Sequence, residues 1–190
     1  KYRIIGQLFD TYWLIEFDQK LFIMDQHAAH EKVLYERFMK RVSEGKPASQ
    51  QLMPPQIITL TLAAGQVLKD SLDTIVNMGF EIESFGGNEY AVRAVPIELY
   101  GASGKDMIME IIDDLMENPG KVSNETIKGR IATMACKAAV KGNNRLQPAE
   151  VRELVSELMT LDNPYNCPHG RPTMISISKY ELEKKFKRIV

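Results

Sequence analysis

The sequence predicts an α+β fold made of two subdomains, one discontinuous along the chain and one inserted into it. Three short strand patterns at the start are followed by a long helix pattern. A β-α-β-β-α pattern then covers about residues 56–120, and helix, strand and helix patterns close the chain. Because strands come in runs of their own rather than alternating with helices, we expect mixed or antiparallel sheets with helices packed on them.

The composition is that of an ordinary globular protein and argues against a membrane-spanning one. The 190 residues suffice for one large core or two small ones. Hydrophobic residues make up 44% and charged residues 26%, and no apolar run approaches the roughly 20 residues of a membrane span. We therefore expect no membrane partner. The net charge of −1 means that binding to nucleic acid would need a local basic patch or delivery by another protein.

The chain contains two cysteines, Cys136 and Cys167. Two are too few for a disulfide scaffold, so we expect a reducing, cytoplasmic setting with thiols free or bound to metal. A single disulfide between them is the alternative. The sequence begins at Lys1 without an initiator methionine, from which we expect a domain of a longer protein.

The first third predicts a strand meander and then a helix. Strand patterns cover 3–8, 11–17 and 20–24, with short polar links between them. Residues 26–42 predict a helix that ends in the breaker-rich segment 43–49. We assign residues 1–55 and 141–190 to the discontinuous subdomain.

The middle of the chain predicts the inserted subdomain, residues 56–140. It has a strand at 56–62, a helix at 63–78 closed by Gly79, a hairpin at 80–95 and a helix at 105–117. A connecting helix is expected over 124–141. After it come a helix over 148–161 with Pro148 in its first turn, a loop, a strand at 173–177 and a last helix. Ser178 and Glu181 have the spacing of a capping box that opens this helix.

The start of the first helix carries a metal-site signal. Asp25 lies at a strand end, and His27 and Glu31, four residues apart, share one helix face with apolar residues. A lone inward carboxylate is costly unless it is paired or binds metal. The alternative is an ordinary hydrogen-bonding or capping role. Glu36 falls on the opposite side of the helical wheel.

Sulfur and imidazole ligands occur later in the chain. Cys167 and His169 lie two apart on a proline-stiffened loop, and Cys136 lies in the connecting helix. With His27 and Glu31 they give five candidate ligands of types that zinc accepts. The spacing fits neither a Cys-x-x-Cys pair nor the zinc-peptidase orders. Spacing alone therefore predicts a mixed metal site without specifying its reaction.

Two further segments allow two interpretations each. Residues 50–55 are extended, because two prolines exclude a helix, and they either enter a strand or form a linear motif for another protein's pocket. Arg130, Lys137 and Lys141 form a basic stripe that is either a solvated face or a phosphate contact beside Cys136.

Three motifs resemble those of the C-terminal domain of MutL-type DNA mismatch-repair proteins. Residues 25–36, Asp-Gln-His-Ala-x-x-Glu-x4-Glu, are similar to the family's nuclease motif. Residues 135–137 and 167–172 resemble two further family motifs in the right order. The match extends over nearly the whole chain, as far as residues 186–188.

The resemblance implies a latent, metal-dependent endonuclease, a hydrolase that nicks one strand of duplex DNA during mismatch repair. It implies a cytoplasmic bacterial homodimer, associated with the nucleoid during repair, with a dimerisation subdomain built from both chain ends and an inserted regulatory subdomain. The implied partners are duplex DNA, the replication sliding clamp and, through the full-length protein, a mismatch-recognition protein. Nothing here resembles the family's nucleotide-binding region or a P-loop.

The resemblance also implies roles for individual residues. The metal site would comprise Asp25, His27, Glu31, Cys136, Cys167 and His169, the first three being catalytic. Thiolates and imidazoles suit Zn²⁺, whereas the hard oxygens of Asp25 suit Mn²⁺ or Mg²⁺ at the scissile phosphate. The candidate phosphate contacts are Arg130, Lys137 and Arg171, and Glu36 would support the site without binding metal. The clamp-binding residues would be Gln50, Leu52, Met53 and Pro55.

The competing hypothesis is a zinc-stabilised dimerisation module without catalytic activity. In that case the soft ligands serve a purely structural ion, and Asp25 caps the helix that follows it.

Overall fold

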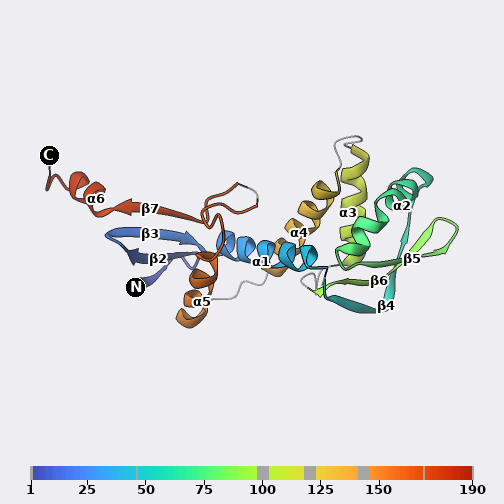
Figure 1. Ribbon diagram of the computed structural model, residues 1–190, viewed down its shortest axis with the longest axis horizontal. Coiled ribbons are helices and arrows are strands. Elements are labelled where there is room, and N and C mark those ends of the chain that lie inside the picture. Colours follow the sequence, from blue (N-terminus) through green and yellow to red (C-terminus); the bar gives the residue numbers. More distant parts are fainter. Residues whose placement is uncertain are drawn as a thin grey trace. The chain divides into compact units, whose positions relative to one another are not determined.

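The computed structural model describes residues 2–45, 47–97, 103–117, 123–140, 146–168 and 170–189, without the side chains of 135–140. The chain divides into two compact units (Figure 1). Unit 1 comprises Lys1–Val33 and Gly142–Val190, and unit 2 comprises Leu34–Lys141. Both contain helices and antiparallel strands, which confirms the predicted α+β class.

Unit 1 is built on a four-stranded antiparallel sheet in the order β1-β2-β3-β7. The strands are β1 (Arg3–Leu8), β2 (Tyr12–Phe17), β3 (Lys20–Asp25) and β7 (Met174–Ser178). The first three form the predicted meander. Their turns, three residues at 9–11 and two at 18–19, place Phe9, Asp10, Asp18 and Gln19 at positive φ, as tight hairpins require. The last strand of the chain pairs with β3, which joins the two ends of the sequence in one sheet.

One face of this sheet is covered by helices. Trp13 and Met24 are buried on this face together with Val33 of α1 (Gln26–Ser43) and Val155 of α5 (Pro148–Leu158). Alternate residues of β2 point to opposite faces, so Trp13 and Ile15 are buried while Leu14 faces the other way. The resulting core carries the start of α1 and is therefore the scaffold of the candidate site.

The predicted helix starts are present. Pro148 lies in the first turn of α5, whose capping box joins Gln147 and Glu150. The last helix, α6 (Lys179–Lys185), opens with the predicted box: Glu181 N donates to Ser178 Oγ over 3.2 Å and Ser178 N donates to Glu181 Oε2 over 2.8 Å. Ser178 Oγ also donates to Glu181 Oε2 over 2.6 Å. This side-chain bond, and then the bond from Ser178 N, lower the pKa of the Glu181 carboxyl.

Unit 2 has a three-stranded antiparallel sheet in the order β4-β6-β5, with α2 and α3 packed against it and α4 packed against these two helices (Figure 1). Its elements are β4 (Ser49–Thr59), α2 (Leu62–Asn77), β5 (Glu81–Gly86), β6 (Glu89–Pro96), α3 (Gly104–Glu117) and α4 (Asn124–Val140). Fully buried residues such as Ile58, Ile75, Ile111 and Ile131 come from the sheet and from all three helices. No helix in the described part of the chain has the length and apolar character needed to cross a membrane.

The first boundary between the units differs from the predicted position. It lies between Val33 and Leu34, inside α1, rather than after residue 55. Two features explain the difference: Phe38, in the second half of α1, is buried in the core of unit 2, and β4 begins at Ser49 and pairs with β6. The second boundary, between Lys141 and Gly142, lies one residue from the predicted one.

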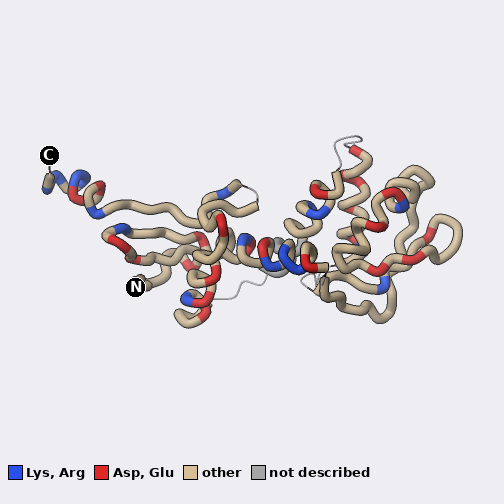
Figure 2. The backbone as a smooth tube through the Cα atoms, in the orientation of Figure 1, with Lys and Arg blue, Asp and Glu red and all other residues tan. Residues whose placement is uncertain are grey.

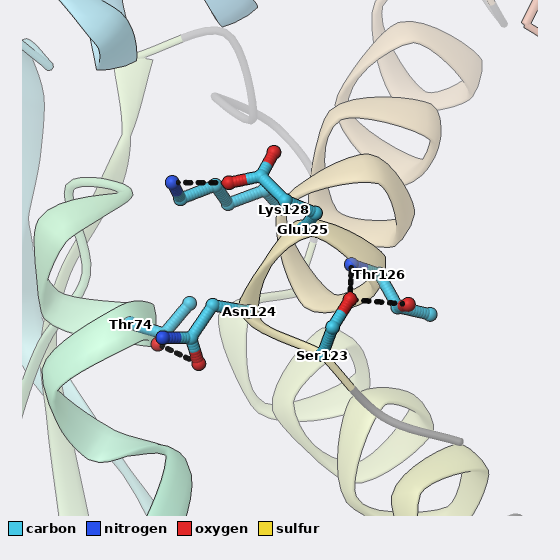
Figure 3. A network of polar contacts seen from close by, with 6 residues as sticks. All are labelled: Thr74, Ser123, Asn124, Glu125, Thr126 and Lys128. Atoms are coloured by element: carbon cyan, nitrogen blue, oxygen red, sulfur yellow. Dashed lines mark hydrogen bonds and ion pairs between the residues drawn. The ribbon is translucent and has the colours of Figure 1, made fainter.

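Helices α2 and α4 are joined by a short polar network (Figure 3). The Thr74 hydroxyl of α2 donates to Asn124 Oδ1 at the start of α4 over 2.8 Å. Ser123 precedes α4, and its Oγ accepts a hydrogen bond from Thr126 N over 3.2 Å, which satisfies one of the free amides of the first turn. The start of α4 is thus capped and attached to α2 at the same point.

The start of α3 packs closely against the sheet. A Cβ added at Gly104 would lie 2.7 Å from Val95 Cγ1 and 3.4 Å from Leu52 Cδ1. Real Cβ atoms do not approach another carbon that closely, so the absence of a side chain at Gly104 is what allows this contact.

We predict that Gly104→Ala destabilises unit 2, although alanine normally favours a helix more than glycine does. The added methyl group would overpack a tight contact, which typically costs about 1–3 kcal/mol. Denaturant unfolding of the wild type, Gly104→Ala, Val95→Ala and the double variant measures this. The second substitution removes the clashing methyl groups, so the cost of Gly104→Ala should shrink in that background. Equal costs in both backgrounds would contradict this account.

Candidate metal centre at the start of helix α1

Three segments of unit 1 meet where β3 ends and α1 begins. Asp25 N donates to Thr173 O over 2.9 Å, and Gln26 N donates to Thr11 O over 3.0 Å. These bonds attach the turn to the residue before β7 and to the residue before β2. The position of Asp25 is therefore fixed by the sheet on both sides.

Asp25 caps helix α1. Its Oδ1 accepts a hydrogen bond from Ala28 N over 3.0 Å, which is the contact that an aspartate at the position before a helix makes. Asp25 is half-buried. Its second carboxylate oxygen accepts no hydrogen bond from the residues that the structure describes. One oxygen thus has a structural role, and the other is available to a ligand.

His27 and Glu31 lie in the first two turns of α1, as the sequence predicts. At this spacing their Cβ atoms lie about 5–6 Å apart on one helix face. His27 is half-buried, and its imidazole has no hydrogen bond or ion pair within the described part of the chain. Glu31 is only 7% exposed, so its carboxylate requires a cationic or hydrogen-bonding partner.

The loop that carries Cys167 is fixed at both of its ends. Cys167 N donates to Arg171 O over 2.8 Å, and Gly170 N donates to Cys167 O over 2.9 Å. Gly170 adopts a φ of +78°, a conformation that glycine takes without steric cost. At the base of the loop, the fully buried Thr173 donates from N to Tyr165 O and from Oγ1 to Pro164 O. Since Thr173 also accepts from Asp25 N, one residue attaches this loop to the start of α1.

Arg171 connects Glu31 with Cys167. Its Nη2 lies 2.8 Å from Glu31 Oε2, and the two residues are 140 positions apart in the sequence. The pKa of the Arg171 guanidinium is raised, first by its hydrogen bond with the Cys167 side chain and then by the Glu31 carboxylate. Cys167 is buried, and it forms no disulfide within the part of the chain that the structure describes. A buried carboxylate and a buried thiol are therefore both within reach of a single positively charged group.

The chemistry of these donors fits a transition-metal site. A carboxylate, a thiol and an imidazole are a mixed set that zinc accepts, and two of them, the Glu31 carboxylate and the Cys167 thiol, lie beside one cation, Arg171. Within the described residues, no three His, Cys, Asp or Glu side chains form a group that could hold a metal ion. The two remaining expected ligands, the Cys136 side chain and His169, lie outside the described residues, as does the Lys137 side chain.

The other predicted charged residues have diverse surroundings. In unit 2, Arg130 of α4 forms an ion pair with Asp114 of α3. Glu36 is half-buried in the part of α1 that belongs to unit 2. Arg171, a candidate phosphate contact, is paired with Glu31, and its side chain is 60% exposed. Basic and acidic segments alternate along α1 and α6 (Figure 2), which agrees with the small net charge of the chain.

Residues 50–55 lie within β4 and also leave its ladder. Gln51 is paired with Ala94, whereas Gln56 is paired with Val92, so residues 52–55 bulge out opposite Arg93. Two consecutive prolines have no N–H to donate, which explains why the ladder is interrupted there. Met53, at the bulge, is 93% exposed. The strand and the exposed-motif interpretations of this segment are thus compatible.

The sequence analysis missed two residues that shape the site, Gln26 and Thr173. Gln26 is 5% exposed, and its Oε1 accepts a hydrogen bond from Trp13 Nε1 over 2.9 Å. Trp13 is the only tryptophan of the chain, and a buried indole usually needs an acceptor. That requirement was the available signal for a polar partner in the core, but it does not identify the partner. Nothing local in the sequence distinguishes Thr173.

Comparisons with known proteins identify relatives across the chain. Residues 5–146 match the family described as "MutL C terminal dimerisation domain". A "DNA mismatch repair protein MutL" from Agathobacter rectalis is 52% identical over 190 residues, which are 100% of this chain and 29% of the relative. Proteins of the same description from Clostridium botulinum (strain Kyoto / Type A2) and Clostridium beijerinckii are 43% and 40% identical over 187 residues, 98% of this chain and 28% of each relative.

The chain thus spans less than a third of the length of these relatives. The family match covers well over half of the chain and confirms the resemblance carried by the three motifs. This chain therefore belongs to the MutL C-terminal dimerisation domain family.

Proposed function

We propose that this domain is the endonuclease part of a DNA mismatch-repair protein. In this proposal it is a latent, metal-dependent hydrolase that nicks one strand of duplex DNA. The observation that carries the proposal is the meeting of Glu31 and Cys167 around one guanidinium, beside the turn that holds Asp25 and His27. A purely structural core would have little reason to gather a carboxylate, a thiol and two more donor side chains at one helix start.

The chemistry of each side chain would determine which metal ion it binds. His27, Glu31 and Cys167, with Cys136 and His169, would hold Zn²⁺, and Asp25 would hold Mn²⁺ or Mg²⁺ through its second oxygen. When bound, that divalent ion would act as a Lewis acid at the phosphodiester. The cap to Ala28 holds the Asp25 carboxylate in one direction. The exposed Arg171 side chain could reach a phosphate next to the cleaved one.

The second candidate function is the zinc-stabilised dimerisation module without catalysis. The capping hydrogen bond of Asp25 favours it, because this bond alone is a sufficient structural reason for an aspartate at that position. The two functions differ in whether the charge of Asp25 matters, since capping needs an acceptor oxygen and metal binding needs a carboxylate.

We predict that Asp25→Asn abolishes nicking without unfolding the domain. Asparagine caps a helix about as well as aspartate, so the bond to Ala28 should persist while the charge is lost. Nicking of supercoiled plasmid in Mn²⁺ should fall by more than about 100-fold, because even residues that only support metal ligands cost about 10–100-fold. The unfolding midpoint should stay close to that of the wild type.

Asp25→Ala is the matched control for capping. It should also lose stability, by about 0.5–2 kcal/mol, which separates the structural role of Asp25 from its charge. Nicking that persists in Asp25→Asn would show that the proposed site is wrong. A wild-type domain that binds zinc but cleaves DNA under no divalent ion would support the dimerisation module instead.

We further propose that the domain forms a homodimer through the outer face of the unit 1 sheet. Leu14, Ile23 and Ile175 lie opposite one another on neighbouring strands, on the face away from the core of unit 1. Ile175 is 54% exposed, and the side chains of Ile5 and Tyr12 are exposed too. A continuous row of apolar side chains on a sheet face is typical of a surface that is covered in the assembly.

We predict that Ile175→Asp shifts the protein from dimer to monomer, because it would place an unpaired charge within a dry interface. Light scattering coupled to size-exclusion chromatography measures the mass. Ile97→Asp is the control, since Ile97 is also an exposed isoleucine but belongs to unit 2. A variant Ile175→Asp that remains dimeric would place the interface elsewhere.

We also propose that the bulge of β4 binds the replication sliding clamp. The bulge presents Met53 almost entirely to solvent, while Leu52 is partly buried against the core of unit 2 and fixes its base. Main-chain groups released from the ladder add hydrogen-bonding capacity for a partner's pocket. With a net charge of −1, the domain would depend on such tethering, and on a mismatch-recognition protein acting through the full-length protein, to reach DNA.

We predict that Gln50→Ala and Met53→Ala each weaken clamp binding by about tenfold or more, which corresponds to losing roughly 1.4 kcal/mol from an interface anchor. Titration calorimetry with the purified clamp measures the affinity. Phe85→Ala is the control, because Phe85 is also an exposed apolar residue but lies near the end of β5. Unchanged clamp affinity in both Gln50→Ala and Met53→Ala would rule out this role.

A further inference from the structure

We propose that Gln26 is a positioning residue for the metal site: through Trp13 it fixes the direction of the turn that carries Asp25 and His27. The inference rests on the proposed function, since it concerns how that site is held. Gln26 stands between two candidate ligands in the sequence, and its own side chain points into the core of unit 1.

The contact is buried and specific. Trp13 Nε1 of β2 donates to Gln26 Oε1 over 2.9 Å, with Trp13 only 4% exposed. Gln7 of β1 lies directly opposite Trp13 in the sheet, and its Nε2 donates to the same oxygen over 3.4 Å. Side chains from two strands, β1 and β2, therefore donate to the same side-chain oxygen, Oε1 of Gln26.

This contact adds what the backbone bonds of the turn do not supply. The amides of Asp25 and Gln26 are held by Thr173 O and Thr11 O, which sets the position of the turn. Further along α1, Ala29 and Val33 pack into the core, and the Gln26 side chain adds an attachment between the two candidate ligands themselves. Because successive helical residues are about 100° apart, holding Gln26 towards Trp13 also determines the direction of His27.

The simpler account is a satisfied polar pair that only stabilises the core. It predicts that loss of the hydrogen bond lowers stability and leaves the metal ligands in place. The positioning account predicts that the ligand geometry itself changes, because metal sites require ligands held within small tolerances by the groups behind them.

The experiment compares Gln26→Met, Trp13→Phe and the double variant with Leu158→Ala. Methionine is about as long as glutamine and offers no comparable acceptor, and phenylalanine keeps an aromatic ring without the N–H. Leu158 is fully buried in the same core, on α5, and its truncation provides a loss of stability that keeps both partners of the Trp13–Gln26 hydrogen bond. The measured quantities are the dissociation constant for Mn²⁺ and the visible absorption spectrum of the protein loaded with Co²⁺ in place of Zn²⁺, which reports ligand geometry.

We expect Gln26→Met and Trp13→Phe each to raise the Mn²⁺ dissociation constant by about tenfold or more and to alter the Co²⁺ spectrum. The double variant should be no worse than the more affected single variant, since both remove one interaction. Leu158→Ala should lower the unfolding midpoint and leave both metal readouts unchanged. In Gln26→Met the emission of Trp13, the only tryptophan, verifies that the hydrogen bond is lost.

The outcomes separate the two proposals. A wild-type protein that binds neither Zn²⁺ nor Mn²⁺ overturns the proposed function and this inference together. A wild-type protein that binds metal and nicks DNA, while both single variants keep its dissociation constant and spectrum, overturns the inference alone. The inference is equally overturned when Leu158→Ala changes the metal readouts as much as Gln26→Met does, because the effect would then follow stability.

Discussion

The hydrogen bond from Asp25 N to Thr173 O is the constraint on which the site depends. It lies just beyond the paired segment of β3 and β7, and it joins the start of α1 to a residue from the other end of the chain. Thr173 in turn fixes the loop that carries Cys167 through its own amide and hydroxyl. Glu31 and Cys167, which are remote in the sequence, lie beside the same guanidinium because a sheet formed by both ends of the chain brings their flanking residues together.

The two charged groups of the site, the Glu31 carboxylate and the Arg171 guanidinium, differ in burial. Glu31 is buried and its position is set by α1, whereas the Arg171 side chain that neutralises it is mostly exposed. Burying a carboxylate without a compensating partner is costly, so the buried position of Glu31 requires a cation beside it. The guanidinium is held beside it by the ion pair with Glu31 and by a hydrogen bond with the Cys167 side chain. The site thus combines a carboxylate that is fixed by burial with a cation that is fixed by polar contacts.

The sequence predicted what depends on local pattern and missed what depends on long-range contact. Periodicity and capping signals predicted the element order, the meander and the common face of His27 and Glu31, because each is determined within a few residues. The boundary inside α1 was missed because one helix supplies Phe38 to unit 2 and Val33 to unit 1, and periodicity does not show which core a residue joins. The proximity of Cys167 to Glu31 was implied by the family resemblance, and the contacts of Gln26 with Trp13 appeared only in three dimensions.

Two segments carry a structural and a proposed functional role at once, and in each the roles use different atoms. Asp25 gives one oxygen to the helix cap, and the other oxygen remains directed away from that bond. An anionic side chain is favoured at a helix N-terminus, and a metal ligand has to be deprotonated, so one carboxylate is compatible with both roles, although capping itself needs only an acceptor oxygen. In β4, residues on either side of the bulge hold the strand to β6, while the bulge exposes Met53. A structural explanation for such a residue is therefore no argument against a functional one, and only substitutions that remove one set of atoms can separate them.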